Sequence, residues 1–263
     1  MEFRKTLEAA GAIWQREFIR YWRDKTRIIS TIVQPLMFLI IFGTGLKSTL
    51  ARGNFGLDFV QFMFPGIIAM SIMSVSFFST ISTVWDREFG FLKEILVAPI
   101  SRVSITVGKI LGAVTIASIQ GFLLLLLAPI LKIRLHPLSF PYLISFMILV
   151  AFSLASLGLL IASLMKTTES FGLMMQLLIF PMFFISGAFF PLTNVPWWMK
   201  WLAAINPLSY GVDALRQILL QRQATGKALS LVSLHPVAIN ALFLLVFSVI
   251  IVMLAALAFN KKN

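Results

Sequence analysis

Six long apolar runs dominate the pattern of hydrophobic and polar positions along the chain. A helix needs about 20 apolar residues to cross the hydrocarbon core of a bilayer, and each run is close to or above that length. The runs cover residues 28–46, 59–84, 105–131, 140–165, 171–190 and 237–259. Because apolar residues are continuous within each run, the pattern predicts helices and excludes a transmembrane β-barrel. We therefore expect an all-α integral membrane protein with six transmembrane helices.

Composition supports membrane insertion and limits the partners. The 263 residues are 59% hydrophobic and 12% charged, and a mean hydropathy of +0.94 is too high for a domain whose surface faces water. A net charge of +12 could indicate nucleic acid binding, but the basic residues form short clusters beside apolar runs, which is typical of contact with anionic lipid. We therefore expect membrane lipid, and no nucleic acid, among the partners.

The basic residues also predict the topology. Of the 22 Lys and Arg residues, 14 lie in segments on the side of the N-terminus, and the remaining 8 lie in the opposite segments. Because basic residues favour the cytoplasmic side, we expect a multi-pass protein of the cytoplasmic membrane with both termini in the cytoplasm.

A basic amphipathic segment precedes the first span. Its aromatic residues share one helical face: Trp14, Phe18, Tyr21 and Trp22. Its arginines share the opposite face: Arg16, Arg20, Arg23 and Arg27. This separation predicts a helix lying in the inner membrane interface rather than a simple cytoplasmic stub. We therefore divide the chain into an N-terminal cytoplasmic interfacial helix at 1–27 and a six-span transmembrane domain at 28–263.

The segment between the fifth and sixth spans, 191–236, differs from an ordinary polar loop. Its first part contains three tryptophans at the spacing of an interfacial aromatic belt: Trp197, Trp198 and Trp201. An Asn206-Pro207 break separates them from a second amphipathic piece. The pattern predicts two short helices that dip into or lie on the outer leaflet. The alternative, a small folded cap, has too few residues to build its own core.

Candidate catalytic and energy-coupling groups are scarce. GTGLKST at 43–49 resembles a phosphate-binding loop, but Leu46 stands before Lys47 where the Walker pattern requires glycine. None of the ten Asp and Glu residues lies in the middle of a predicted span, where a proton-driven carrier or an intramembrane protease would hold one. His136 and His235 are too isolated to form a metal site, and cysteine is absent. We expect no catalytic residue, no metal and no cofactor on this chain.

Small and amide residues within the spans predict helix contacts. GKILG at 108–112, and Gly158 with Ala162, have the small-xxx-small spacing that lets helices approach closely. We interpret both as packing within the chain first and dimer contacts second. Gln120 and Gln176 are interpreted as interhelical hydrogen bonds rather than substrate contacts.

The charged stretch REFGFLKEILVAPISR at 87–102 lies between the second and third spans, on the side predicted to be cytoplasmic. Phe89, Leu92 and Leu96 form one apolar stripe at helical spacing, and Pro99 ends the pattern. These features predict a helix at 86–98. Its acidic residues are poorly placed against anionic lipid, so the mixed charge favours docking on a protein over a simple interfacial turn.

Two segments resemble the membrane subunit of type 2 ABC exporters, and the permeases of drug export and nodulation-factor export are the closest type. The segments are WDREFGFLKEILVAPISRVSITVGKILG at 85–112 and FISGAFFPLTNVPWWMKWLAAINPLSYGVDALR at 184–216. The resemblance covers nearly the whole chain. It implies six spans, an inner interfacial helix, a coupling helix between spans two and three, and paired re-entrant helices before span six. It also implies a separate ABC ATPase subunit that holds ATP and Mg, with two permeases and two ATPases in the assembly.

The resemblance also implies roles for particular residues. The ATPase-coupling segment would comprise Arg87, Glu88, Phe89, Gly90, Phe91, Leu92, Lys93, Glu94 and Leu96. The outer re-entrant motif would comprise Asn206, Pro207, Tyr210, Asp213 and Arg216. The substrate path should lie at the dimer interface, lined by spans two and five. Its candidate residues are Phe180, Met182, Phe183 and Phe184, although simple packing is the more common role of an aromatic residue within a span.

Together these features lead us to expect a homodimeric permease that exports an amphipathic or lipid-linked molecule across the cytoplasmic membrane. A drug, a lipid, a glycolipid or a polysaccharide would each fit that description. Two other classes stay open at this point: a membrane scaffold that needs no nucleotide, and an ion-coupled secondary carrier.

Overall fold

The computed structural model describes residues 2–45, 59–90, 102–131, 133, 135–221 and 233–260. In this part of the chain the regular secondary structure is helical, with no β-strand. Six stretches are long and apolar enough to cross a membrane: Lys25–Gly43, Phe59–Glu88, Val103–Leu125, Pro137–Leu164, Thr168–Ile185 and Val237–Ala258. Each coincides with a predicted span, which confirms the all-α class and the six transmembrane helices.

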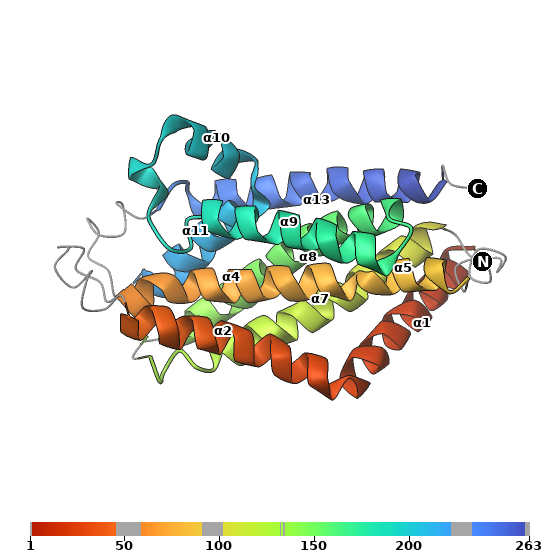
Figure 1. The fold of residues 1–263 in the computed structure, drawn as a ribbon, viewed down its shortest axis with the longest axis horizontal. Coiled ribbons are helices and arrows are strands. Elements are labelled where there is room, and N and C mark those ends of the chain that lie inside the picture. Colours follow the sequence, from red (N-terminus) through yellow and green to blue (C-terminus); the bar gives the residue numbers. More distant parts are fainter. Residues whose placement is uncertain are drawn as a thin grey trace.

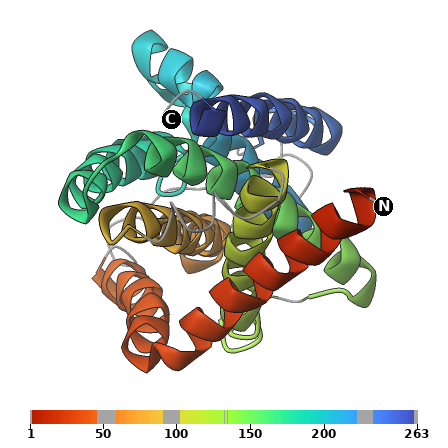
Figure 2. The same ribbon diagram turned by 90° about the vertical axis from the view of Figure 1, so that its right-hand side faces the viewer.

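The helices form one bundle. Its first part comprises α1 (Glu2–Arg23), α2 (Lys25–Gly45), α4 (Phe59–Ser79), α5 (Ile81–Glu88) and α7 (Arg102–Leu125). Its second part comprises η1 (Pro137–Ser139), α8 (Phe140–Leu164), α9 (Thr168–Ile185), η2 (Leu192–Asn194), α10 (Trp197–Ile205), α11 (Pro207–Leu220) and α13 (Val237–Asn260). The long helices run side by side, and α1 begins and α13 ends at the end of the bundle where α5 lies (Figure 1). α1 crosses that end at a slant (Figure 2).

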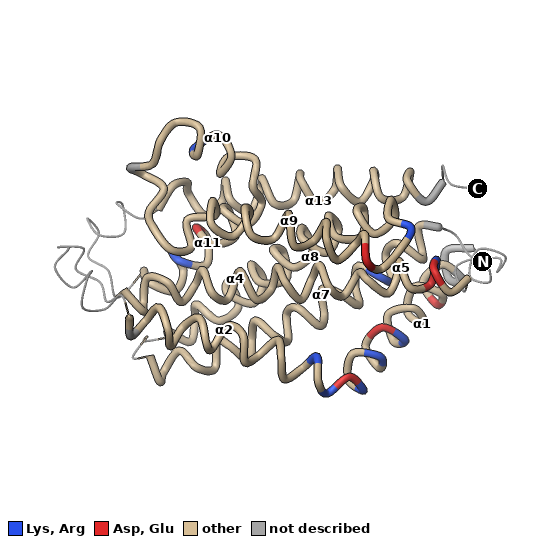
Figure 3. Tube along the Cα trace, in the orientation of Figure 1, with Lys and Arg blue, Asp and Glu red and all other residues tan. Residues whose placement is uncertain are grey.

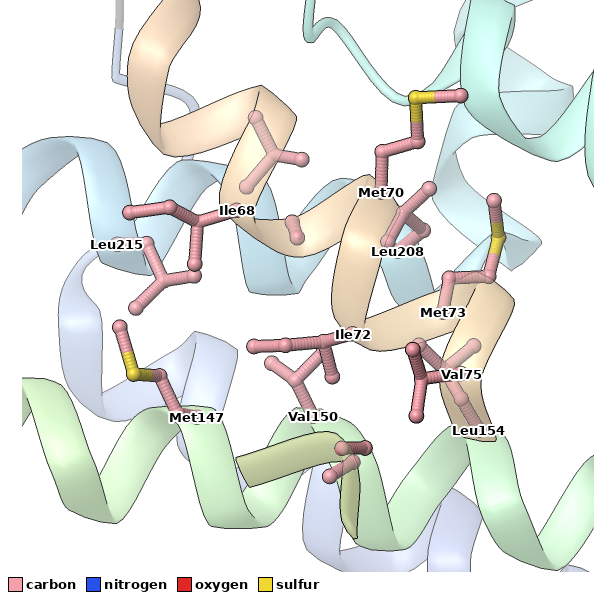
Figure 4. Close-up of a cluster of buried hydrophobic side chains, with 14 of the residues drawn as sticks. Ile68, Met70, Ile72, Met73, Val75, Met147, Val150, Leu154, Leu208 and Leu215 are labelled. Carbon is pink, nitrogen blue, oxygen red and sulfur yellow. The ribbon is translucent and has the colours of Figure 1, made fainter. Parts of the chain in front are cut away.

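α4 lies at the centre of the bundle. Its Ile68 and Ile72 lie among Met147 and Val150 of α8 and Leu215 of α11 in the hydrophobic core (Figure 4). Burial of this apolar surface places α11 inside the bundle, although α11 is too short to span a membrane. By contrast, α2, α9 and α13 keep rows of exposed apolar side chains, as expected of helices that face lipid or a second chain.

Glycines bring α7 against α1. A Cβ atom on Gly108 would lie 2.7 Å from the carbonyl oxygen of Ala10, and one on Gly112 would lie 2.8 Å from the Cβ of Glu17. Only glycine allows this approach. Gly158 likewise faces α4, because its Cβ would lie 3.0 Å from the ring of Phe77. These contacts confirm that both small-residue patterns pack helices within the chain.

A proline and a glutamine are paired across two helices. Pro35 has no N–H, so the carbonyl of Thr31, four residues earlier in α2, lacks its helical hydrogen bond. Gln120 of α7 supplies the missing donor, with its Nε2 2.7 Å from that carbonyl oxygen. This confirms the interhelical role predicted for Gln120. Gln176 is exposed on α9 and makes no hydrogen bond to any other described residue.

α1 meets the bundle through a face that differs from the predicted one. Trp14, Phe18 and Trp22 form a stacked row with ring centroids 6.1 and 6.2 Å apart, but Tyr21 is buried and does not belong to that row. Glu17 is buried as well, because it lies on the face that contacts α7. Helical spacing predicted an aromatic face and an arginine face. The face of α1 that enters the bundle instead contains an aromatic residue, Tyr21, together with an acidic residue, Glu17.

A single residue, Asp24, separates α1 from α2. Its Oδ1 accepts a hydrogen bond from the backbone N–H of Arg27 at 3.0 Å, which is the contact of an N-terminal cap. The first spanning helix therefore begins at Lys25, a little before the predicted boundary at residue 28.

α10 and α11 are the two short helices predicted before the last span, and they meet at Asn206. They differ in burial. Trp197 and Trp201 of α10 are exposed, whereas nearly every residue of α11 is buried. Insertion of the pair into the outer leaflet stays a prediction.

Candidate functional site

Four charged side chains from α1, α5 and α7 form a cluster. They are Arg16, Glu17, Asp86 and Lys109, which we call the four-charge cluster. Asp86 Oδ2 accepts hydrogen bonds from Arg16 Nη2 and Lys109 Nζ, both at 2.7 Å. Glu17 Oε1 lies 3.0 Å from Arg16 Nη2 and 3.6 Å from Lys109 Nζ. Two positive and two negative charges thus balance within the cluster.

Burial makes the four-charge cluster sensitive to the loss of any member. Asp86, Lys109 and Glu17 are 4%, 3% and 6% exposed. Burial alone would lower the pKa of Arg16, but the hydrogen bond and negative charge of Asp86 outweigh it, so the pKa is raised. Removal of one partner from a buried pair leaves an uncompensated charge, which is strongly destabilising. The cluster therefore locks α1 to α5 and α7.

The sequence did not predict the four-charge cluster. Its members are far apart in the chain, and Asp86 was assigned to a helix facing a partner. Lys109 lies inside the GKILG motif, whose glycines explain the contact with α1 but not the charge. The signal that could have found the cluster is Lys109 itself, because an ionisable residue within a span needs a partner.

The predicted helix at 86–98 differs from the observed structure at its start. α5 ends at Glu88, Phe89 is its C-terminal cap, and Gly90 has a φ of 84°. A residue in the left-handed region cannot continue an α-helix, so residues 86–88 belong to the end of the second span and not to a separate helix. Five predicted coupling residues lie outside the described residues: Phe91, Leu92, Lys93, Glu94 and Leu96.

Arg87 and Glu88 contact the turn between α8 and α9. Arg87 Nη1 donates to the carbonyl of Ala162 at 3.4 Å and to that of Met165. Glu88 Oε2 accepts from the backbone N–H of Thr168 at 2.9 Å and from its hydroxyl, at the first residue of α9, where a negative charge is favourable. These two predicted docking residues therefore bind within the chain. Phe89, 68% exposed, and Gly90 face outward.

Asp213 organises the opposite end of the bundle. Its carboxylate accepts hydrogen bonds from the backbone N–H groups of Leu234 and His235 at 2.9 and 3.0 Å. It also accepts from Asn240 Nδ2 at 2.8 Å and Gln217 Nε2 at 3.0 Å. One buried carboxylate therefore fastens the start of α13 to α11.

Asn206 and Tyr210 fix the turn between α10 and α11. Asn206 Oδ1 accepts from the N–H of Leu208 at 3.0 Å and caps α11, while its Nδ2 donates to the carbonyl of Met182 at 2.7 Å. The Tyr210 hydroxyl donates to the carbonyl of Ala204 at 2.9 Å. Pro207 occupies the first position of α11, where its missing N–H costs nothing.

Arg216 is the buried cation of α11. Its Nη2 donates to the carbonyl of Gly187 at 2.7 Å, and its guanidinium lies 4.0 Å from the ring centroid of Phe62. Burial lowers the pKa of Arg216 to about 10, against the opposing effect of the Asp213 charge. The five residues of the outer motif thus hold α11 in place through contacts with α4, α9, α10 and α13.

The four candidate path residues on α9 do not share one surface. Phe183 is 2% exposed and packs within an aromatic group that includes Phe38 and Phe189. Phe180 and Phe184 are 51% and 46% exposed, and Met182 is partly buried. Phe183 therefore packs in the core in this structure, and only the exposed phenylalanines present a surface that a substrate or a second chain could contact.

Comparison with known proteins places these features in one family. The family model described as ABC-2 type transporter matches residues 8–220. The chain is 33% identical to the transport permease ycf38 of Cyanophora paradoxa over 77% of this chain and 71% of that protein. It is 29% identical to nodulation protein J of Rhizobium leguminosarum bv. viciae over 88% and 89% of the two chains. It is 28% identical to the inner membrane transport permease YadH of Escherichia coli K12 over 79% and 81%.

Proposed function

We propose that this chain, which belongs to the ABC-2 type transporter family, is the membrane subunit of an exporter driven by ATP hydrolysis in a separate ABC ATPase. A membrane transport permease is the function that the family and the names of the relatives support. The proposal adds three statements to this: the partner is an ABC ATPase, the energy source is ATP, and the direction of transport is export. In it, ATP and Mg are bound by the ATPase and not by this chain.

One structural observation carries the proposal. Three consecutive residues at the end of α5 are attached to different helices: Asp86 to α1 and α7, Arg87 to α8, and Glu88 to α9. The chain then turns at Gly90. A force applied to the segment after Gly90 would therefore reach four helices through short hydrogen bonds. This arrangement is suited to transmit movement of a docked ATPase into the bundle.

The exposed apolar surfaces of α2 and α9 support a second permease in the proposed assembly. α2 and α9 present apolar side chains such as Val33, Ile40, Leu177 and Phe180, which could meet lipid or a second permease. We propose a homodimer with two ATPase subunits, located in the cytoplasmic membrane with both termini in the cytoplasm. The substrate class is an amphipathic or lipid-linked molecule.

Reconstitution tests the proposed energy source. The chain is purified together with the ABC ATPase that co-purifies with it, and the complex is placed in liposomes with a fluorescent short-chain phospholipid as the probe. The proposal predicts probe movement that requires ATP and stops when the Walker lysine of the ATPase is replaced. Probe movement by the chain alone, or movement that an ionophore abolishes while ATP hydrolysis continues, would overturn it and support a nucleotide-independent or ion-coupled protein.

A further inference from the structure

A groove runs between α2 and the adjoining helices α4 and α5. It contains two hollows of about 300 and 60 Å³ that share Thr31, Gln34 and Phe78. The larger hollow is also lined by Arg27, Ser30, Ile81 and Trp85. The smaller one is also lined by Pro35, Met70, Ser71, Ser74 and Val75. The larger hollow is lined by Arg27, and basic residues gather at the bend between α1 and α2 where α2 begins (Figure 3).

Arg27 makes no salt bridge to a described acidic residue, although the charges of Asp24 and Glu17 act on it from a greater distance. Its Nη2 donates to Ser79 Oγ at 3.2 Å, and its guanidinium lies 5.5 Å from the ring centroid of Tyr21. Asp24 binds the backbone N–H of Arg27 and not its side chain. A guanidinium has five N–H donors, so most of those on Arg27 stay available to an anion.

The deeper part of the groove contains polar groups that also lack partners. Ser71 is 2% exposed, and its Oγ makes no hydrogen bond within the described part of the chain. The side chain of Gln34, which is exposed, makes none to a described residue either. Buried polar groups in native proteins are nearly always hydrogen-bonded, so an unpaired hydroxyl lining a hollow points to a ligand that would pair with it.

The opposite side of the groove is apolar. Phe78, Ile81 and Trp85 line it, and Phe78 is 41% exposed. The guanidinium of Arg20 lies 4.8 Å from the ring centroid of Trp85, which adds a second positive charge beside the groove. A ligand that fits these walls would have an anionic group, further hydrogen-bonding groups and an apolar portion.

We propose that this groove binds the head group of an anionic amphipath, with phosphate or carboxylate oxygens at Arg27 and the apolar portion along Phe78 and Ile81. The inference rests on the proposed function in one respect, since it makes the groove an entry site for the exported molecule. Arg27 and Gln34 are seven residues apart, which corresponds to about 10 Å along α2. The groove therefore accommodates a head group larger than a single phosphate.

A binding measurement on the purified chain in neutral detergent tests this site without the ATPase. The probe is dioctanoyl phosphatidic acid, compared with dioctanoyl phosphatidylcholine and with inorganic phosphate, and bound lipid is counted by native mass spectrometry. We expect phosphatidic acid to bind at least about tenfold more tightly than either comparison ligand, because only it combines a net negative phosphomonoester, uncovered by choline, with an apolar portion.

Matched variants locate the binding. Arg27→Gln should weaken phosphatidic acid about tenfold or more, while Lys25→Gln, an equal change of charge on an exposed residue two positions away, should leave it unchanged. Ser74→Phe fills the groove without altering Arg27 and should weaken binding similarly, which guards against a folding defect in Arg27→Gln.

Several results would overturn the inference. Equal effects of Arg27→Gln and Lys25→Gln would exclude the groove as the site. Inorganic phosphate binding as tightly as phosphatidic acid would indicate a site for free anions, and equal binding of phosphatidylcholine would indicate ordinary lipid contact. Because no ATPase is present, failure here leaves the ATP-driven export untouched, whereas intact binding without ATP-driven transport would refute the proposed function alone.

Discussion

The ammonium of Lys109 donates a hydrogen bond to the carboxylate of Asp86 at 2.7 Å, and both side chains are almost completely buried. The bond joins the N-terminal third of α7 to the end of α5, and Arg16 adds α1 to the same carboxylate. The end of the bundle predicted to face the ATPase is therefore held by an internal ion-pair network. The next residues, Arg87 and Glu88, extend this attachment to α8 and α9.

Loss of Lys109 should strongly destabilise the protein. Lys109→Met leaves Asp86 and Glu17 with one cation instead of two in a buried site, and we expect a loss of about 3–5 kcal/mol in the free energy of unfolding. Lys166→Met, at an exposed lysine near the same end of the bundle, is the control and should change it by less than about 0.5 kcal/mol. Unfolding in detergent, followed by circular dichroism, measures both.

The double variant Lys109→Met with Asp86→Leu separates the ion pair from mere packing. Because it removes both charges, it should lose less stability than the sum of the two single variants, by about 1–3 kcal/mol. Additive losses would show that Lys109 and Asp86 do not interact as the 2.7 Å contact indicates.

The pairing of Gln120 with the carbonyl freed by Pro35 predicts a rescue. Gln120→Leu leaves the Thr31 carbonyl without a donor and should cost about 1–3 kcal/mol. Pro35→Ala restores a backbone N–H to that carbonyl, so the loss caused by Gln120→Leu should be smaller in a Pro35→Ala background. Thermal unfolding of the unsubstituted protein, the two single variants and the double variant measures the two losses of stability. An undiminished loss, or an equal loss in the exposed-site control Gln176→Leu, would contradict the pairing.

The two glycine environments predict opposite signs for the same substitution. Gly108→Ala places a methyl group 2.7 Å from a backbone oxygen of α1 and should cost about 1–3 kcal/mol. Gly172→Ala meets nothing within 4 Å in α9 and should be neutral or stabilise by up to about 1 kcal/mol, through helix propensity. Limited proteolysis of α1 should increase only for Gly108→Ala, and equal cleavage of both variants would argue against glycine-dependent packing of α1.

Span length, the Asn206-Pro207 break and the small-residue motifs were predicted from the sequence because each is a local signal. The spans require only a run of apolar residues. Asparagine followed by proline marks the start of a helix, whichever neighbours α11 then packs against. Spacing shows which residues share a face, but it does not show which helix that face meets. For this reason Tyr21 enters the core against expectation, and the four-charge cluster could not be assembled from separate segments. The break at Gly90 was missed because the apolar stripe that begins at Phe89 continues beyond it.

Site-specific cross-linking tests most directly whether the end of α5 receives the ATPase. The chain contains no cysteine, so Phe89→Cys and Leu138→Cys each introduce a single thiol at a side chain that is 68% or 72% exposed, at opposite ends of the bundle. Each variant is labelled with a thiol-reactive photo-cross-linker in the complex purified with the ABC ATPase. If the ATPase docks beside the end of α5, we expect a cross-linked product of permease and ATPase from Phe89→Cys and none from Leu138→Cys. Cross-linking from Leu138→Cys alone, or from neither position in a complex that hydrolyses ATP, would contradict docking there.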